Sequence, residues 1–291
     1  MPTGAGKSMC FQIPALIMGG LTVVVSPLVA LMEDQVAALR LTGVSAETIN
    51  SSRAYHENAQ SWRRVANGEC PILYISPERL MTERMLKALS KLPLRLLAID
   101  EAHCISRWGP AFRPHYQDLQ LLKNRFPEIP IAAMTATADT LTRADIAQRL
   151  FGEGGKILVY GFDRPNIRLS VALRNNWKHQ LLAFVVAHKG VSGIVYCLSR
   201  RRTEEVSAYL SKNHINTLPY HAGMDANTRN RNQERFMTEP GLVIVATIAF
   251  GMGIDKPDVG YVFHANLPGN MEAYYQEIGR AGRNGAPVQA M

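Results

Sequence analysis

The sequence has no long apolar run. No hydrophobic stretch of the 291-residue chain reaches the roughly 20 residues that a helix needs to span a bilayer. After Lys7 and Ser8 comes a short mixed segment without the cleavage pattern of a secretory signal. We therefore expect a protein that neither spans a membrane nor is exported.

Cysteine is scarce and widely spaced. The four cysteines, Cys10, Cys70, Cys104 and Cys197, contain no CxxC pair. Zinc sites and disulfide frameworks both use regularly spaced thiols, so the sequence predicts neither, and the pattern fits a reducing cytoplasm. Low-complexity tracts and short repeats are missing too, which favours an ordinary globular protein.

Acidic residues are outnumbered by basic ones. The chain has 32 Lys and Arg residues against 24 Asp and Glu residues, a formal net charge of +8 at pH 7. Such a balance suits a polyanion such as nucleic acid, because lysine and arginine displace condensed counterions from a phosphate backbone. Charge alone leaves a merely basic soluble protein equally open.

Short apolar runs alternate with helical patterns along the whole chain. The strand candidates are residues 22–26, 72–76, 96–100 and 131–135, and then residues 193–197, 217–220, 242–246 and 261–264. Continuous apolar runs separated by helices predict parallel sheets with both faces covered, an α/β fold. Glycines and a proline in residues 152–165 mark a linker, which predicts two domains, residues 1–160 and 161–291.

A glycine-rich turn opens the chain. It comprises Thr3, Gly4, Ala5, Gly6, Lys7 and Ser8, and Met1 stands where the general phosphate-loop pattern has its first glycine. The N–H groups of such a turn can surround a triphosphate, while Lys7 meets the outer phosphates and the Ser8 hydroxyl ligates Mg²⁺. A chance glycine turn is the alternative, and the spacing favours phosphate binding.

Two acids close the strand candidate at residues 96–100. Asp100 can hold Mg²⁺, directly or through water, and Glu101 can orient and deprotonate an attacking water. Two exposed acids at a strand end are common in proteins. Their occurrence together with Lys7 and Ser8, in the expected order, favours a nucleotide-hydrolysing site.

A third pattern runs from Gln276 to Arg283. We expect its two arginines, Arg280 and Arg283, to lie three residues apart on one helix face, where they can meet a transferring phosphate. A basic helix end favoured by the helix dipole is the alternative interpretation.

Together these segments resemble the superfamily-two helicases. The Asp100-Glu-Ala-His103 box, residues 134–138 and residues 276–283 match that superfamily. Residues 102–114 are similar to the aromatic-rich loop of the RecQ DNA helicases, the most family-specific part. Residues 22–28, 220–223 and 246–255 match as well, so the resemblance covers essentially the whole chain.

The resemblance implies two RecA-like P-loop domains, each a mostly parallel sheet flanked by helices, and an ATP-dependent DNA helicase. ATP and Mg²⁺ would be held by residues 3–8, Asp100, Glu101 and Asp255, with Gln276, Arg280 and Arg283 completing the catalytic set. The enzyme would move along single-stranded DNA from 3′ to 5′ and unwind forked DNA in repair and recombination. The resemblance also implies a monomer without zinc or membrane association, located in the cytoplasm and, in a bacterium, at the nucleoid.

The same resemblance implies a set of DNA contacts. Trp108 and Phe112 would stack on bases and Arg113 would meet phosphate, the alternative being core aromatics. The residues that would hold DNA phosphates at strand ends are Ser26, Pro27, Ser199, Arg200, His221 and Thr247. Taken singly, each of these also fits an ordinary strand-to-helix cap. Thr135 and Thr137 match the motif that couples the ATP and DNA sites, the alternative being structural linkers.

The sequence departs from the family pattern at both ends. Family members carry a strand and an adenine-binding segment before the phosphate loop, and zinc, winged-helix and helical modules after the arginine motif. The alternative to a working helicase core is therefore a catalytically impaired nucleic-acid-binding fragment, with the hypothesis that this chain hydrolyses ATP poorly or not at all. We also expect strand edges to be exposed around a missing central strand of the first sheet. An RNA helicase with a similar core is disfavoured by the aromatic loop.

Overall fold

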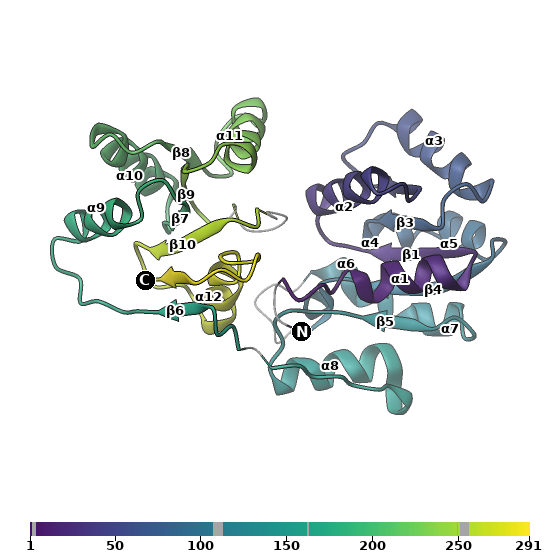
Figure 1. The fold of residues 1–291 in the computed structure, drawn as a ribbon. Coiled ribbons are helices and arrows are strands. Elements are labelled where there is room, and N and C mark those ends of the chain that lie inside the picture. The colour runs from purple at the N-terminus through teal and green to yellow at the C-terminus, as the bar shows by residue number, and fades with distance from the viewer. Residues whose placement is uncertain (2–3, 107–112, 162, 249, 251–255) are drawn as a thin grey trace. The chain divides into compact units, whose positions relative to one another are not determined.

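The chain folds into two compact α/β units. The computed structural model describes residues 1, 4–106, 113–161, 163–248, 250 and 256–291. The first unit comprises residue 1 and residues 5–161, and the second comprises residues 162–291 with the short segment that ends at Gly4. In each unit a sheet lies between helices (Figure 1). Within the described ranges, none of the helices combines the length and apolar character that crossing a membrane requires.

The first unit is built on a five-stranded parallel sheet. Its strands are β1 (Leu21–Val25), β2 (Ala46–Ile49), β3 (Ile72–Ile75), β4 (Leu94–Ile99) and β5 (Ile131–Ala133), in the order β2-β3-β1-β4-β5. The helices are α1 (Met9–Met18), α2 (Val29–Leu41), α3 (Tyr55–Ala66), α4 (Pro77–Leu80), α5 (Glu83–Leu89), α6 (Pro114–Gln117), α7 (Leu122–Arg125) and α8 (Thr140–Phe151), with short 3₁₀ turns at Ala102–Ile105, Asp118–Leu121 and Gly152–Gly154. The parallel sheet predicted from the apolar runs is confirmed.

The expected gap in the middle of this sheet is wrong. β1 pairs with β3 on one side and with β4 on the other, and β4 pairs in turn with β5. Because Val23 is in register with both Leu73 and Leu97, no space for a further strand exists beside β1. Within the described residues, the unpaired edges belong to the outer strands β2 and β5.

Both faces of the central strand are covered. Successive side chains of a strand point to opposite faces, so Val23 packs in one apolar cluster with Ile99, whereas Val24 packs in another with Phe11 and Met32. This burial on two faces explains why β1 is a continuous apolar run, since a strand with one solvated face would alternate.

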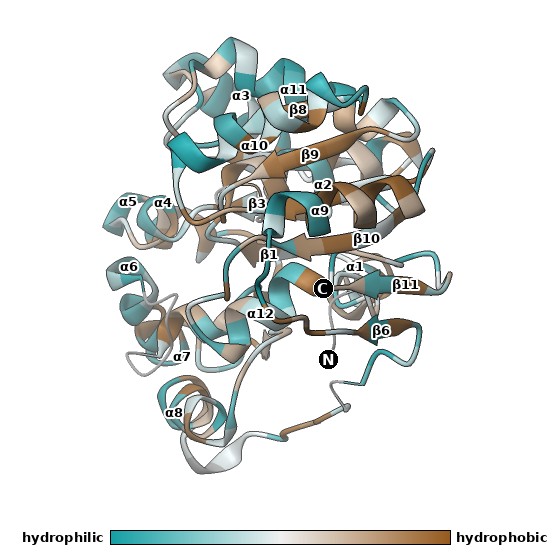
Figure 2. Ribbon diagram, turned by 90° about the vertical axis from the view of Figure 1, so that its left-hand side faces the viewer, coloured by the Kyte–Doolittle hydropathy of each residue, from teal (hydrophilic) through white to brown (hydrophobic). Residues whose placement is uncertain are grey.

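The second unit has a six-stranded parallel sheet. Its strands are β6 (Ile167–Leu169), β7 (Ser192–Tyr196), β8 (Thr217–Tyr220), β9 (Val243–Ala246), β10 (Val259–His264) and β11 (Val288–Ala290), in the order β6-β11-β10-β7-β9-β8. The helices are α9 (Trp177–Ala187), α10 (Arg200–Lys212), α11 (Ala226–Thr238) and α12 (Met271–Ile278). Figure 2 shows β9 and β10 as hydrophobic and α10 and α11 as largely hydrophilic, as expected for a buried sheet under surface helices.

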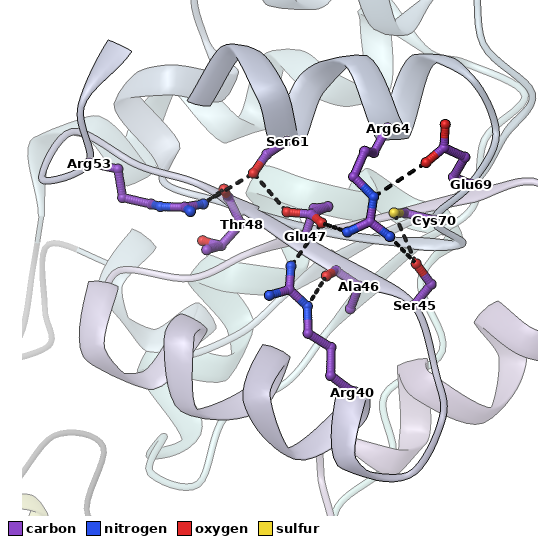
Figure 3. A network of polar contacts seen from close by, with 10 residues as sticks. All are labelled: Arg40, Ser45, Ala46, Glu47, Thr48, Arg53, Ser61, Arg64, Glu69 and Cys70. Carbon is purple, nitrogen blue, oxygen red and sulfur yellow. Dashed lines mark hydrogen bonds and ion pairs between the residues drawn. The ribbon is translucent and has the colours of Figure 1, made fainter. Parts of the chain in front are cut away.

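A buried carboxylate joins β2 to two helices. Glu47, in the middle of this edge strand, is 3% exposed and accepts hydrogen bonds from Arg40 of α2 and from Ser61 and Arg64 of α3 (Figure 3). Ser61 donates at 2.7 Å and Arg40 at 2.8 Å. Both carboxylate oxygens are therefore satisfied, which is the condition for burying a charge without a large loss of stability.

Candidate functional site

The glycine-rich turn leads directly into a helix. Gly4 and Gly6 have φ angles of 81° and 75°, in the left-handed region that glycine adopts without steric cost. The Met9 N–H donates to the carbonyl of Gly6 at 2.9 Å, so α1 begins immediately behind Lys7 and Ser8. The positive end of the helix dipole at such an N-terminus favours an anion. Thr3 lies outside the described residues.

Two carboxylates follow β4 at its carboxyl end. The Asp100 N–H donates to Val25 at 2.9 Å, and the Glu101 N–H donates to Oδ1 of Asp100 at 2.9 Å. Glu101 has a φ of 48°, a conformation that costs a non-glycine residue free energy and often marks a functional site. Burial and then the charge of Glu101 raise the pKa of Asp100 to about 7, although the nearby charge of Lys7 lowers it. The structure thus brings Lys7 close to the acidic pair.

His103 connects the acidic pair to the segment after β5. Its Nδ1 lies 2.9 Å from Oγ1 of Thr135 and 3.2 Å from Oε2 of Glu101. The Thr135 hydroxyl donates to the carbonyl of Thr137 at 3.0 Å, so its oxygen accepts and His103 is the donor. Burial by itself lowers the pKa of His103, but hydrogen bonds with Cys104 and Glu101 and the charge of Glu101 outweigh it and raise the pKa to about 10.

The DNA contacts predicted in the first unit are only partly on the surface. Ser26 follows β1 and is 1% exposed, so its hydroxyl does not face solvent. The carbonyl of Pro27 accepts a hydrogen bond from Nη1 of Arg113 at 2.9 Å, which ties the residues after the acidic box to the end of β1. Trp108 and Phe112 lie outside the described residues. The phosphate contact of Arg113 stays a prediction.

The predicted contacts in the second unit gather at the carboxyl ends of β7, β8 and β9. Ser199 caps α10, its hydroxyl accepting from the Arg202 N–H at 3.2 Å, and Arg200 is exposed beside it. His221 follows β8 and is buried, with Nε2 3.1 Å from Oε1 of Glu204. Thr247 follows β9, and its N–H donates to Tyr220 at 3.2 Å. The cap interpretation of Ser199 is therefore confirmed, and a phosphate contact there stays a prediction.

The prediction that Arg280 and Arg283 share a helix face is wrong. Helix α12 ends at Ile278, and the chain turns away over Gly279 and Gly282. Gly282 has a φ of 59°, and its N–H donates to Val259 of β10 at 2.8 Å, which fixes the turn to the sheet. Arg280 is 8% exposed and Arg283 half-buried, while Gln276 remains on the helix. Asp255 lies outside the described residues.

Arg164, which the sequence assigned to a linker, and Asn166, which follows that linker, hold this arginine turn. Arg164 donates to the carbonyls of Ala281 at 3.0 Å and Gly282 at 2.9 Å, and Asn166 donates to Gly282 at 2.9 Å. Burial, and next the charge of Arg283, lower the pKa of Arg164, so the two guanidinium groups lie close together. Ala281 lies 117 residues after Arg164 in the sequence, and its contact is made by a main-chain carbonyl. No local sequence pattern predicts such a contact.

Two family models match the chain. The model described as DEAD/DEAH box helicase matches residues 1–145, and the model described as helicase conserved C-terminal domain matches residues 176–285. With the two parallel sheets and the residues at their carboxyl ends, these matches define a helicase core of two α/β units.

Similarity to curated relatives identifies a narrower family than the two family models do. The ATP-dependent DNA helicase RecQ of Haemophilus influenzae is 46% identical over 291 residues, which are 100% of this chain and 47% of the relative. Its counterpart from Bacillus subtilis is 41% identical over 286 residues, 98% of this chain and 48% of the relative. The chain belongs to the RecQ family of helicases. It spans about half the length of these bacterial relatives.

Solved structures agree on the fold. A Mycobacterium smegmatis helicase Lhr bound to ssDNA and AMP-PNP has a TM-score of 0.71 at 22% identity, with 99% of this chain and 42% of that chain covered. The helicase MrfA bound to DNA and AMPPNP has a TM-score of 0.76 at 19% identity, with 100% and 45% covered. At this identity the likeness supports the RecA-like architecture alone.

Proposed function

We propose that the chain is the motor core of an ATP-dependent DNA helicase that couples ATP hydrolysis to movement along single-stranded DNA. The observation that carries the proposal is the polar connection beside Lys7 and Asp100, in which Glu101 pairs with His103 and His103 is hydrogen-bonded to Thr135. A hydrolytic carboxylate bonded to a neighbouring strand end gives a route by which nucleotide chemistry acts on the rest of the sheet.

The first unit supplies the nucleotide chemistry in this proposal. The turn before α1 would bind the phosphates, Lys7 would neutralise the outer ones, and Glu101 would orient and deprotonate the attacking water. Ser8 and Asp100 offer hard oxygen ligands that fit Mg²⁺, which usually keeps several waters and needs only one or two protein oxygens beside the phosphates. When bound, Mg²⁺ supplies positive charge to the transferring phosphate.

The second unit supplies Gln276, Arg280 and Arg283 in this proposal. Two guanidinium groups can stabilise the negative charge that develops on the transferring phosphoryl group when ATP draws the units together. Arg164 and Asn166 would then act as positioning residues, because they hold the main chain of the turn on which both arginines lie.

The DNA-related roles follow from the family. Single-stranded DNA would lie on Ser199, Arg200 and Thr247, with Trp108 and Phe112 stacking on bases, and would position the motor without sequence readout. We infer movement from 3′ to 5′, unwinding of forked duplexes in repair or recombination, a monomeric motor and a DNA-associated location in the cytoplasm. The relatives from H. influenzae and B. subtilis are named ATP-dependent DNA helicases, which supports DNA over RNA.

The test is phosphate release from ATP with Mg²⁺, with and without single-stranded DNA, by the chain and its Glu101→Gln variant. We expect DNA to stimulate hydrolysis and Glu101→Gln to lower the rate at least about 100-fold, the scale of general-base catalysis, while DNA affinity is retained. The exposed acid Glu128 gives the matched control Glu128→Gln, which should hydrolyse normally.

Three outcomes would contradict the proposal. Binding of DNA without hydrolysis would make the chain a nucleic-acid-binding module. Equal competition by RNA and DNA would favour an RNA helicase. Strand displacement only from substrates with a 5′ tail would reverse the inferred polarity.

A further inference from the structure

A basic and aromatic patch joins α9 to α10, from Arg174 just before α9 to Tyr209 in the last turn of α10. The guanidinium carbons of Arg174 and Arg202 lie 5.2 and 4.9 Å from the ring centroid of Trp177. The ammonium of Lys178 lies 5.7 Å from the ring centroid of Tyr209. We call these five residues the α9–α10 patch.

The rings of the patch are fixed by packing. Trp177 and Tyr209 are both partly buried against the apolar cluster under α9 and α10, which contains Leu181 and Val206. Arg174 and Lys178 remain exposed. Each cation therefore has a fixed ring on one side and solvent on the other. A guanidinium that lies over a ring keeps its N–H groups available for an anion at its edge.

The acidic residues near the patch are already engaged. Glu204 lies 3.1 Å from His221, and Glu205 lies 2.8 Å from Arg201. In the part of the chain that the structure describes, no carboxylate lies within ion-pair distance of Arg174, Lys178 or Arg202. The patch therefore carries uncompensated positive charge.

The patch continues the predicted phosphate contacts of α10. The Ser199 hydroxyl accepts from the Arg202 N–H, so Arg202 lies within one turn of Ser199 and Arg200. We propose that the α9–α10 patch is a further binding site for the phosphates of single-stranded DNA, reached by the strand beyond Ser199 and Arg200. This inference rests on the proposed function, because it extends the DNA path of the same motor.

The experiment measures the binding of fluorescent oligo(dT) to the chain by anisotropy over a series of NaCl concentrations. In the double variant Arg174→Gln/Arg202→Gln we expect affinity at low salt to fall about tenfold, and the slope of log K against log salt to shrink by about 1.4, since each phosphate contact on a single strand contributes about 0.7. The matched control is Lys87→Gln/Lys91→Gln, which removes the same charge from two exposed residues of the first unit. It should leave the slope unchanged.

The outcomes separate this inference from the proposed function. Suppose that the parent chain binds oligo(dT) and hydrolyses ATP, but the double variant has an unchanged salt slope. That result overturns the proposed binding site at the patch and leaves the proposed motor function standing. An equal loss in the control variant shows a general charge effect and also overturns the patch. If the double variant loses binding of poly-glutamate but not of oligo(dT), the patch serves an acidic protein. A chain that does not bind oligo(dT) at all overturns both.

Discussion

The imidazole of His264 and the carboxylate of Glu277 lie 2.7 Å apart, and both side chains are almost fully buried. His264 ends β10 and stacks on Tyr196 with ring centroids 5.5 Å apart, whereas Glu277 lies in the last turn of α12. The pair joins the helix that precedes the arginine turn to the centre of the second sheet. Its removal should therefore affect both stability and the placement of Arg280.

We expect Glu277→Ala to lower the free energy of unfolding by about 2 kcal/mol, because it leaves a buried imidazole nitrogen without its charged acceptor. Glu277→Gln retains one hydrogen bond to His264 and should lose less. Urea unfolding measures both, with Glu272→Gln in the first turn of α12 as the control. Equal stability of Glu277→Ala and the parent would show that the pair contributes nothing.

Much of the fold could be predicted from apolar runs. The eight strands that were predicted are present. β1, β3, β7 and β9 are buried along their whole length and read as continuous apolar segments, whereas the edge strands β5 and β8 are mostly half-buried. β2 was missed because Glu47 interrupts its apolar pattern. The burial of this carboxylate depends on Arg40 and Arg64, and the sequence alone does not show that they are its partners. β6 and β11 are three-residue strands, too short for any period to emerge.

The parts of the candidate site that could be predicted are those that form short sequence motifs, such as residues 3–8 and 100–103. Lys7 lies just before α1 and Asp100 directly follows β4, and the two charges lie close enough to interact. The end of α12 could not be predicted from an arginine spacing of three, since the hydrogen bond from Gly282 to Val259 competes with the helix. The contacts of Arg164 have no sequence signal, because main-chain carbonyls are present at every residue.

A close approach at Gly223 yields a second prediction. A Cβ on Gly223 would lie 2.9 Å from Cδ and Nη1 of Arg200. Since Arg200 is a long, exposed side chain, Gly223→Ala should displace it without unfolding the protein. We expect an affinity for oligo(dT) about three- to tenfold lower, the scale of one lost phosphate contact.

The control for Gly223→Ala is Gly269→Ala, where a Cβ meets no atom within 4 Å among the described residues. Combining Gly223→Ala with Arg200→Gln should add nothing to the effect of Arg200→Gln, because both remove the same contact. Additive losses would show that Gly223 does not act through Arg200.

The raised pKa of His103 leads to a prediction about pH. Its pKa is about 10 in the folded chain and near 6.5 in an unfolded chain, so the folded state holds the proton more tightly. The resulting stability is fully present below about pH 6.5 and is lost as the pH rises towards 10. The melting temperature of the chain should therefore fall over this window more steeply than that of His103→Gln. Parallel curves for the two proteins would contradict the assignment.

Arg64 has one buried and one exposed carboxylate partner, so the contributions of the two ion pairs to stability can be compared. Arg64 binds Glu47, whose side chain is 4% exposed, and also Glu69, whose side chain is 48% exposed and lies 3.3 Å away. Breaking a buried charge pair costs far more than breaking a solvated one, because the remaining charge stays desolvated. We expect Glu47→Ala to lower the free energy of unfolding by about 3 kcal/mol. Glu69→Ala should cause no measurable change.

The role of Glu47 should be structural alone, since its partners fasten α2 and α3 to an edge strand away from the acidic box. Glu47→Gln, which retains the Ser61 and Arg64 hydrogen bonds in part, should lose less stability than Glu47→Ala. At a temperature where every variant is folded, DNA-stimulated ATP hydrolysis should match that of the parent chain. A loss of hydrolysis in folded Glu47→Ala would instead show that this strand transmits force to the nucleotide site.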